Sequence, residues 1–194
     1  MMDKFIERFF SAPTGSFFIF GPRGTGKTTW LKETFPEAYL VDLLDEETFR
    51  NHIAHPDRIK QIVKANPQTN CFIIDEVQKA PAILDSIHSL IEEYKTHDFI
   101  MTGSSARKLR RGGVNLLAGR ALLTYFHPFM AAELGSDFSF DAALTTGLIP
   151  LILSANSPEK ALATYIALYL KEEVKEEGLV RGIGSFARFL ESIS

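Results

Sequence analysis

Five short apolar segments alternate with more polar segments along the first two thirds of the chain. They occupy residues 16–20, 38–43, 71–75, 99–102 and 121–126. Each has the length of a buried strand, and the first ends at a Gly-Pro pair, where a buried strand commonly enters a tight turn. Segments of helical period lie between several of them, at residues 28–34, 56–65 and 81–94. Strands that alternate with helices predict an α/β fold built on a parallel sheet.

The last third of the chain, from about Met130, has helical rather than strand periodicity. Residues 158–178 place apolar side chains along one face and end in the charged run 171–177, which predicts an amphipathic helix with a solvated end. The longest apolar stretches, such as 148–153, fall well short of the roughly 20 residues that a transmembrane helix needs. The N-terminal residues mix acids and bases with apolar residues, unlike a signal peptide. We therefore expect a cytoplasmic protein without a membrane partner.

The segment that follows the first apolar run carries the clearest chemical signal. Residues 21–28 match the pattern G-x-x-x-x-G-K-[ST] in full and lie between a predicted strand and a predicted helix. Glycines allow backbone N–H groups to face a phosphate, and the start of a helix adds a favourable dipole. Lys27 can reach the β- and γ-phosphates, and Thr28 is the expected Mg²⁺ ligand. This pattern predicts a P-loop that binds ATP with Mg²⁺.

Two consecutive carboxylates end the third apolar segment. Parallel strands deliver such residues to the carboxyl edge of the sheet, where ligands bind. Asp75 is expected to hold the magnesium, together with Thr28. Glu76 is placed to accept a proton from the water that attacks the γ-phosphate. The pair therefore predicts hydrolysis as well as binding.

Two further features are candidates for the same site. Residues 102–105, Thr-Gly-Ser-Ser, end the fourth strand, and Ser104 is the preferred polar sensor of the γ-phosphate, although the same residues are ordinary turn formers. A basic stretch at 107–111 and the later Arg120 could neutralise the transferring phosphoryl group in the same or a neighbouring subunit, or contact nucleic acid. Arg120 is the better catalytic candidate because it immediately precedes a predicted strand. The stretch 107–111 is equally typical of a solvated helix face.

Composition narrows these alternatives. The chain has 194 residues, 45% of them hydrophobic and 23% charged, as in ordinary folded proteins. Its net charge of −3 gives no special support to nucleic-acid binding. The single cysteine, Cys71, excludes an internal disulfide and suits a reducing compartment. We interpret Cys71 as a small buried strand residue, and the histidines as structural or surface residues.

Together, four ordered motifs resemble the predicted AAA-type ATPases of bacteria and archaea that carry a C-terminal domain of unknown function. The motifs are Gly-Pro-Arg-Gly-Thr-Gly-Lys-Thr-Thr at 21–29, Ile-Asp-Glu-Val-Gln-Lys-Ala-Pro at 74–81, Thr-Gly-Ser-Ser at 102–105 and Leu-Ala-Gly-Arg at 117–120. The resemblance implies nucleotide binding by Gly21, Pro22, Arg23, Gly24, Thr25, Gly26, Lys27, Thr28 and Thr29. It assigns catalysis to Lys27, Glu76, Ser104 and Arg120, and metal binding to Thr28 and Asp75.

The resemblance also implies an architecture. The expected fold is a P-loop NTPase of the AAA/RecA-like kind, a three-layer sandwich with strand order 5-1-4-3-2 and a small helical C-terminal extension. Residues 1–135 would form the ATPase core and 136–194 the start of a truncated C-terminal domain. In such proteins that domain continues for about 150–200 residues, an ordinary domain size. Any protein or DNA partner bound there would depend on the missing part.

Three functions remain open at this point. The first is an ATPase whose activity is weak without an oligomer or the C-terminal domain. The second is a nucleotide-dependent switch that binds ATP with little turnover, as expected if Arg120 or a partner must complete the site. The third is a DNA-associated ATPase that uses the basic stretch 107–111.

Overall fold

The computed structural model describes residues 5–111, 117, 119–170, 188 and 192. The described residues form two compact units. Arg8–His127 make up the first, here called the sheet unit. The described residues beyond His127, together with those before Arg8, belong to the second, here called the helical unit.

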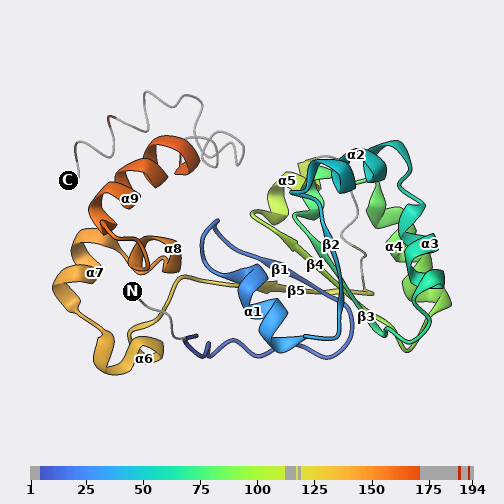
Figure 1. Ribbon diagram of the computed structural model, residues 1–194, viewed down its shortest axis with the longest axis horizontal. Coiled ribbons are helices and arrows are strands. Elements are labelled where there is room, and N and C mark those ends of the chain that lie inside the picture. The colour runs from blue at the N-terminus through green and yellow to red at the C-terminus, as the bar shows by residue number, and fades with distance from the viewer. Residues whose placement is uncertain (1–4, 112–116, 118, 171–187, 189–191, 193–194) are drawn as a thin grey trace. The chain divides into compact units, whose positions relative to one another are not determined.

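The sheet unit alternates strands and helices as the hydrophobic pattern predicts (Figure 1). Its strands are β1 (Phe17–Phe20), β2 (Tyr39–Asp42), β3 (Cys71–Asp75), β4 (Asp98–Gly103) and β5 (Leu122–Tyr125). Its helices are α1 (Lys27–Thr34), α2 (Glu46–Ala54), α3 (Arg58–Ala65), the 3-10 helix η1 (Val77–Lys79), α4 (Ile83–Glu93) and α5 (Ala106–Arg111). All five predicted strands are therefore confirmed.

The five strands form one sheet in the order β2-β3-β4-β1-β5, and all four pairings are parallel. This is the expected order 5-1-4-3-2, counted from the other edge. Phe20 at the end of β1 is level with Gly103 on β4 and with Tyr125 on β5. The carboxyl ends of the central strands therefore meet at one edge, and the loop after Phe20 starts there.

Both faces of the sheet are covered, which makes the sheet unit a three-layer sandwich. Because successive strand side chains point to opposite faces, Phe18 and Phe20 join one core while Phe17 and Ile19 join the other. The first core packs against α3 and α4 through residues such as Ile59, Val63, Ile87 and Leu90. The second packs against Trp30 and Leu31 of α1. Figure 1 shows α1 on one side of the sheet and α3 and α4 on the other.

The helix boundaries differ from the sequence pattern in two ways. We expected the second and third helices to open at Pro56 and Pro81, but α3 begins at Arg58 and α4 at Ile83. The residues in between form turns with i to i+3 hydrogen bonds, such as Leu84 N–H to Pro81 O at 3.1 Å. Helix α2 was not predicted. It begins after Asp45, whose side chain accepts a hydrogen bond from the Thr48 N–H at 2.8 Å.

The helical unit is built from short helices, as the periodicity after Met130 predicts. They are α6 (Ala131–Leu134), the 3-10 helix η2 (Gly135–Asp137), α7 (Phe140–Thr146), α8 (Pro150–Leu153), α9 (Pro158–Tyr165) and the π-helical turn η3 (Ile166–Leu170). Pro150 and Pro158 each start a helix, where the missing N–H has no intrahelical acceptor to lose. The predicted helix 158–178 is thus confirmed as an α-helix up to Tyr165. From Ile166 to Leu170 the chain forms a π-helical turn instead. Its charged end, 171–177, lies outside the described residues.

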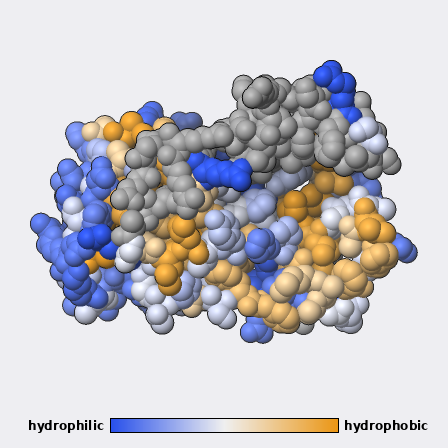
Figure 2. Space-filling model, turned by 180° about the vertical axis from the view of Figure 1, so that it is seen from behind, coloured by the Kyte–Doolittle hydropathy of each residue, from blue (hydrophilic) through white to orange (hydrophobic). Residues whose placement is uncertain are grey.

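Apolar side chains also reach the surface. They include Leu122 and Tyr125 on the edge strand β5 and Phe140 and Leu144 on α7, all more than half exposed. Figure 2 shows hydrophobic residues gathered in several patches on the face that it presents. Among the described helices, none combines the length and the apolar composition needed to cross a membrane.

Cys71 begins β3, so it is the strand residue that the sequence predicts, but it is half-buried rather than buried. Its position is at the amino edge of the sheet. Burial, with a smaller contribution from the Asp98 carboxylate, raises the pKa of the thiol to about 11. The group is therefore protonated at neutral pH and is a poor nucleophile.

Candidate functional site

The predicted phosphate loop connects β1 to α1 at the carboxyl edge of the sheet. Gly24 and Gly26 have φ of 76° and 88°, a left-handed conformation that glycine adopts without a side-chain clash. Gly26 stands at the N-terminus of α1, and no acidic side chain occupies the first turn of that helix. The helix start therefore offers unneutralised N–H groups to an anion.

Lys27 lies folded against this loop. Its side chain is only 6% exposed, and Nζ donates hydrogen bonds to Gly21 O at 2.6 Å and Pro22 O at 3.1 Å. The loop carbonyls thus replace water around the ammonium group. A phosphate oxygen that entered the loop would meet a cation that is already largely desolvated, which strengthens their attraction.

Asp75, the last residue of β3, connects α1 to the neighbouring strand β4. Its carboxylate is buried, and Oδ2 accepts a hydrogen bond from the Thr28 hydroxyl at 2.8 Å. Oδ1 accepts a hydrogen bond from the Thr102 hydroxyl of β4. The two predicted metal ligands, Thr28 and Asp75, are therefore brought together by the fold. Thr29, the last residue of the predicted binding set, is exposed on α1.

Glu76 follows β3 in a left-handed conformation, with φ of 58° and ψ of 47°. This conformation costs an ordinary side chain roughly 1–2 kcal/mol, so other contacts must hold it. One such contact is the hydrogen bond from the Glu76 N–H to the Thr102 hydroxyl at 3.0 Å. The hydroxyl of Thr102 thereby fixes both consecutive acids, Asp75 through its side chain and Glu76 through its backbone.

Gln78 is a site residue that the sequence analysis missed. Its amide Nε2 donates a hydrogen bond to Glu76 Oε2 and lies 3.4 Å from the Ser104 hydroxyl. The side chain is 8% exposed, and its Oε1 has no hydrogen-bond partner among the described residues. Gln78 thus joins the predicted base to the predicted sensor. The only sequence signal was its place in the motif at 74–81, which does not reveal that η1 turns it back toward Glu76.

Thr102 was also underestimated, because the pattern Thr-Gly-Ser-Ser did not distinguish its hydroxyl from that of Ser104. The hydroxyl of Thr102 is fully buried against Asp75, while Ser104 is half-buried one residue beyond β4. Gly103 between them leaves room for Gln78, since a Cβ there would lie 2.5 Å from Gln78 Oε1. Thr102 therefore holds the acids in place, and Ser104 is the residue with some access to a ligand.

Arg120 does not join this cluster. It precedes β5, and because Leu122 is level with Phe17, Arg120 lies at the amino edge of the sheet. The phosphate loop lies at the opposite edge, roughly 20 Å away along the strands at 3.3 Å per residue. Arg120 instead donates a hydrogen bond to Glu92, and hydrogen bonds from Lys95 and Arg120 lower the pKa of Glu92 to about 2. The structure thus contradicts catalysis by Arg120 within its own chain, while a role in a neighbouring subunit stays a prediction.

The basic stretch 107–111 lies on α5, directly after Ser105. Arg107 is exposed and Leu109 is buried in the core. The side chains of Lys108, Arg110 and Arg111 lie outside the described part of the structure. DNA binding by this stretch therefore stays a hypothesis.

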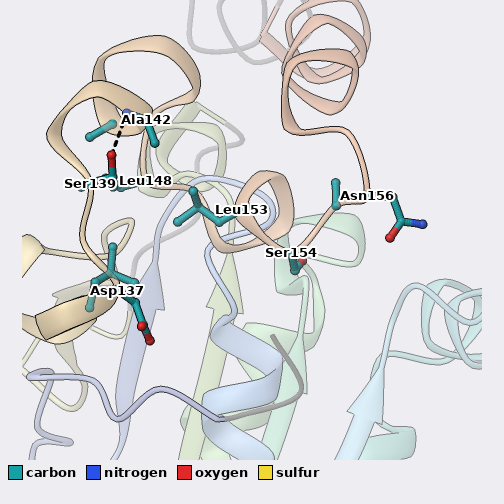
Figure 3. A pocket seen from close by; sticks show the side chains of 10 residues that line it. Asp137, Ser139, Ala142, Leu148, Leu153, Ser154 and Asn156 are labelled. Carbon is teal, nitrogen blue, oxygen red and sulfur yellow. Dashed lines mark hydrogen bonds between the residues drawn. The ribbon is translucent and has the colours of Figure 1, made fainter. Parts of the chain in front are cut away.

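A pocket of about 360 Å³ lies elsewhere, within the helical unit (Figure 3). It is lined mainly by residues of α7 and α8 and their flanking loops, including Asp137, Leu148, Ser154 and Asn156. None of the described residues that line it is Lys or Arg. The loop at β1 has the cation Lys27 beside its glycines, so it remains the better candidate for a phosphate site.

The parallel sheet, the phosphate loop and the two acids at the end of β3 define a P-loop nucleotide-binding fold. A sequence model of the AAA domain family matches residues 14–135. The chain belongs to this family, so the expected class, an AAA-type P-loop ATPase, is confirmed. The C-terminal domain implied by the resemblance lies beyond the matched residues and stays a prediction, as does the boundary at residue 135.

Solved structures to which the chain is similar include two DnaA structures, the first of them from a replication initiation protein. Domain III of DnaA from Thermotoga maritima has a TM-score of 0.38 at 14% identity, covering 82% of this chain and 77% of that one. DnaA from Aquifex aeolicus bound to AMPPCP has a TM-score of 0.41 at 17% identity, covering 84% of this chain and 59% of that one. A search of curated proteins finds no match.

Gly21 should tolerate no side chain. A Cβ at this position would lie 2.0 Å from the carbonyl oxygen of Phe126, whose own N–H bonds to Phe20 O at 2.6 Å. We expect Gly21→Ala to displace the loop, to destabilise the fold by about 1–3 kcal/mol and to weaken ADP binding by roughly tenfold or more. Thermal unfolding and fluorescence titration with a labelled ADP measure the two effects.

Gly15→Ala is the matched control for this change. Gly15 has a φ of 80°, but nothing lies within 4 Å of a Cβ there. It should lose about 1 kcal/mol of stability and keep its nucleotide affinity. Unchanged ADP binding by Gly21→Ala would contradict the close approach of the loop to Phe126.

Proposed function

We propose that the protein binds ATP and Mg²⁺ at the loop 21–28 and hydrolyses ATP there. The observation that carries this proposal is the convergence of Lys27, Asp75, Glu76 and Ser104 at one edge of the sheet. Phosphoryl transfer requires little covalent chemistry from the protein. Positioning and charge neutralisation are the main tasks, and these residues supply a cation, two acids and a hydroxyl for them.

Lys27 would exchange its contacts with the Gly21 and Pro22 carbonyls for oxygens of the β- and γ-phosphates. The loop N–H groups and the start of α1 would bind the β-phosphate. Exchange of carbonyl oxygens for charged phosphate oxygens strengthens the hydrogen bonds of the ammonium group. Binding of the triphosphate is thereby favoured.

The oxygens of Thr28 and Asp75 fit a magnesium ion. A hydroxyl and a carboxylate are oxygen donors of the kind that Mg²⁺ prefers. Thr28 Oγ1 and Asp75 Oδ2 are 2.8 Å apart. When bound, Mg²⁺ would neutralise charge that develops on the phosphates during transfer. Thr102 would keep Asp75 directed toward Thr28.

Glu76 would accept the proton of the attacking water. Its position after β3, its restrained backbone and the hydrogen bond from Gln78 direct the carboxylate within the site. Ser104 would contact the γ-phosphate. Gln78 contacts both Glu76 and Ser104. It would therefore fix the position of the Glu76 carboxylate relative to the γ-phosphate that Ser104 contacts.

A second candidate function is a switch that binds ATP with little turnover by itself. The position of Arg120 favours it, because that arginine is about a sheet length away from the loop of its own chain. Full turnover would then require the arginine of a second copy or of another partner. We therefore also propose that the protein forms a homo-oligomer, or that it binds a protein or DNA partner through a C-terminal domain.

Replacement of Glu76 tests the base. Glu76→Gln keeps the hydrogen-bonding shape but cannot take a proton, so phosphate release should fall by about 100-fold or more while ATP affinity is retained. Steady-state phosphate release and labelled-ATP titration measure these quantities, with Glu33→Gln on the exposed side of α1 as the control. Equal turnover in Glu76→Gln would contradict the assignment. Tight ATP binding without release by the wild type would favour the switch.

Mixing two variants tests whether Arg120 acts in a neighbouring subunit. Arg120→Ala should lower phosphate release by about 1,000-fold if the arginine neutralises the transferring phosphoryl group. An equimolar mixture of Arg120→Ala with Glu76→Gln should regain activity, because some sites then combine an intact Glu76 with an intact Arg120. Lys95→Ala, which removes the other cation bound to Glu92, should behave as the wild type. A mixture without recovered activity would argue against catalysis in trans.

Gln78 should affect turnover without affecting binding. Gln78→Ala removes the hydrogen bond that orients Glu76, and phosphate release should fall by about tenfold. ATP affinity should change little, because Gln78 contacts none of the residues 21–29 through the hydrogen bonds described. Gln61→Ala, on the exposed side of α3, is the matched control. A loss of ATP affinity equal to the loss of turnover would instead indicate a general collapse of the site.

A further inference from the structure

The N-terminal segment places an arginine against the phosphate loop. The guanidinium of Arg8 donates a hydrogen bond to the carbonyl oxygen of Thr25 at 3.0 Å. It also donates to the carbonyl oxygen of His127 at 2.5 Å and lies 4.2 Å from the centre of the Phe126 ring. One half-buried cation therefore connects the loop to the end of β5. No motif in the sequence marks Arg8 for this position.

Aromatic packing fixes the segment that carries Arg8. The ring of Phe10 packs edge-on against Trp30 of α1 at 4.9 Å and against Phe126 at 5.3 Å. Phe126 is buried, and its N–H bonds to Phe20 O at 2.6 Å. The guanidinium thus rests on a part of the core that is itself held by β1. Through its contact with Thr25, Arg8 connects the packed core to the loop.

The Thr25 carbonyl belongs to the same peptide plane as the N–H of Gly26. In a trans peptide the C=O and the N–H point in opposite directions. Because Arg8 binds the carbonyl, the N–H of Gly26 points away from Arg8. The Thr25 hydroxyl adds a second restraint, since it donates to Pro22 O at 2.9 Å, and its residue is fully buried.

We infer that Arg8 is a positioning residue of the phosphate loop, which holds the Thr25–Gly26 peptide so that the Gly26 N–H faces the nucleotide phosphates. This inference rests on the proposed binding of ATP at the loop. Gly26 has a φ of 88°, and a glycine peptide can rotate between several orientations at little steric cost. Arg8 removes that freedom before the ligand binds. The forked guanidinium suits the task, because it can bind two carbonyls and stack on a ring at once.

The experiment compares the wild type with Arg8→Ala and Arg8→Lys, with ADP as the probe. Arg8→Ala should raise the dissociation constant for ADP about tenfold, the value expected for loss of one charge-assisted hydrogen bond. Arg8→Lys keeps the charge but not the fork, and should give an intermediate value. Arg50→Ala removes an equal charge from the exposed surface of α2 and should bind ADP as the wild type does.

The Gly26 amide resonance separates positioning from general stability. An N–H that donates to a phosphate should shift downfield when ADP is added, and ¹⁵N-labelled wild-type protein should show this shift. The shift should be lost or reduced in Arg8→Ala at a temperature where thermal unfolding shows that the variant is folded. If Arg8→Ala does not fold, Arg8→Lys decides the question through the same resonance.

The outcomes are distinct. The deciding variant is Arg8→Ala, or Arg8→Lys if Arg8→Ala does not fold. If that variant has the ADP affinity and the Gly26 shift of the wild type, the inference is overturned and the proposed function stands. A wild-type chain that binds no ADP would overturn both. Weaker binding with an unchanged Gly26 shift would overturn the assignment of the Thr25–Gly26 peptide, since the effect would then arise elsewhere.

Discussion

The buried carboxylate of Asp75 is the interaction on which the site depends. A carboxylate removed from water must be compensated by hydrogen bonds or an ion, and here hydroxyls of Thr28 and Thr102 provide them. These two hydroxyls come from α1 and β4, so the carboxylate connects the helix after the phosphate loop to the centre of the sheet. The same Thr102 hydroxyl restrains Glu76. Loss of this carboxylate would therefore disturb α1, the candidate base Glu76 and β4 together.

The polar groups of the site are already engaged with the protein itself. Lys27 binds loop carbonyls, Thr28 binds Asp75, and Gln78 binds Glu76. In the proposed function the first two contacts would be exchanged for contacts with phosphate and magnesium, while the hydrogen bond from Gln78 to Glu76 would be kept. Such exchange avoids both an unpaired buried charge before binding and a large rearrangement after it. It also means that affinity depends on how well the loop is held beforehand, which is the task inferred for Arg8.

The direction of the parallel strands decides whether Arg120 can reach the phosphate loop of its own chain. All carboxyl ends lie at one edge, so residues that follow β1, β3 and β4 converge, whereas residues that precede β5 lie at the other edge. Arg120 belongs to the second group and is paired with Glu92 on α4. An ATPase core arranged in this way can be complete for binding and still incomplete for fast hydrolysis. The proposed switch function builds on that geometry, with Arg120 of a second copy as the candidate to complete the site.

Local patterns in the sequence determined the five strands and the candidates Lys27, Thr28, Asp75 and Glu76, which the fold brings to one edge of the sheet; the strand order was implied by the family resemblance. These features are local because strand period, loop glycines and adjacent acids are each encoded within a few neighbouring residues. Only the tertiary structure decided the places of Arg8, Gln78 and Arg120. The contact of Arg8 with Thr25 depends on aromatic packing against α1 and β5, and that of Gln78 on the turn of η1 beneath Gly103. Contacts between distant segments depend on the packed core as a whole, so no short pattern in the chain records them.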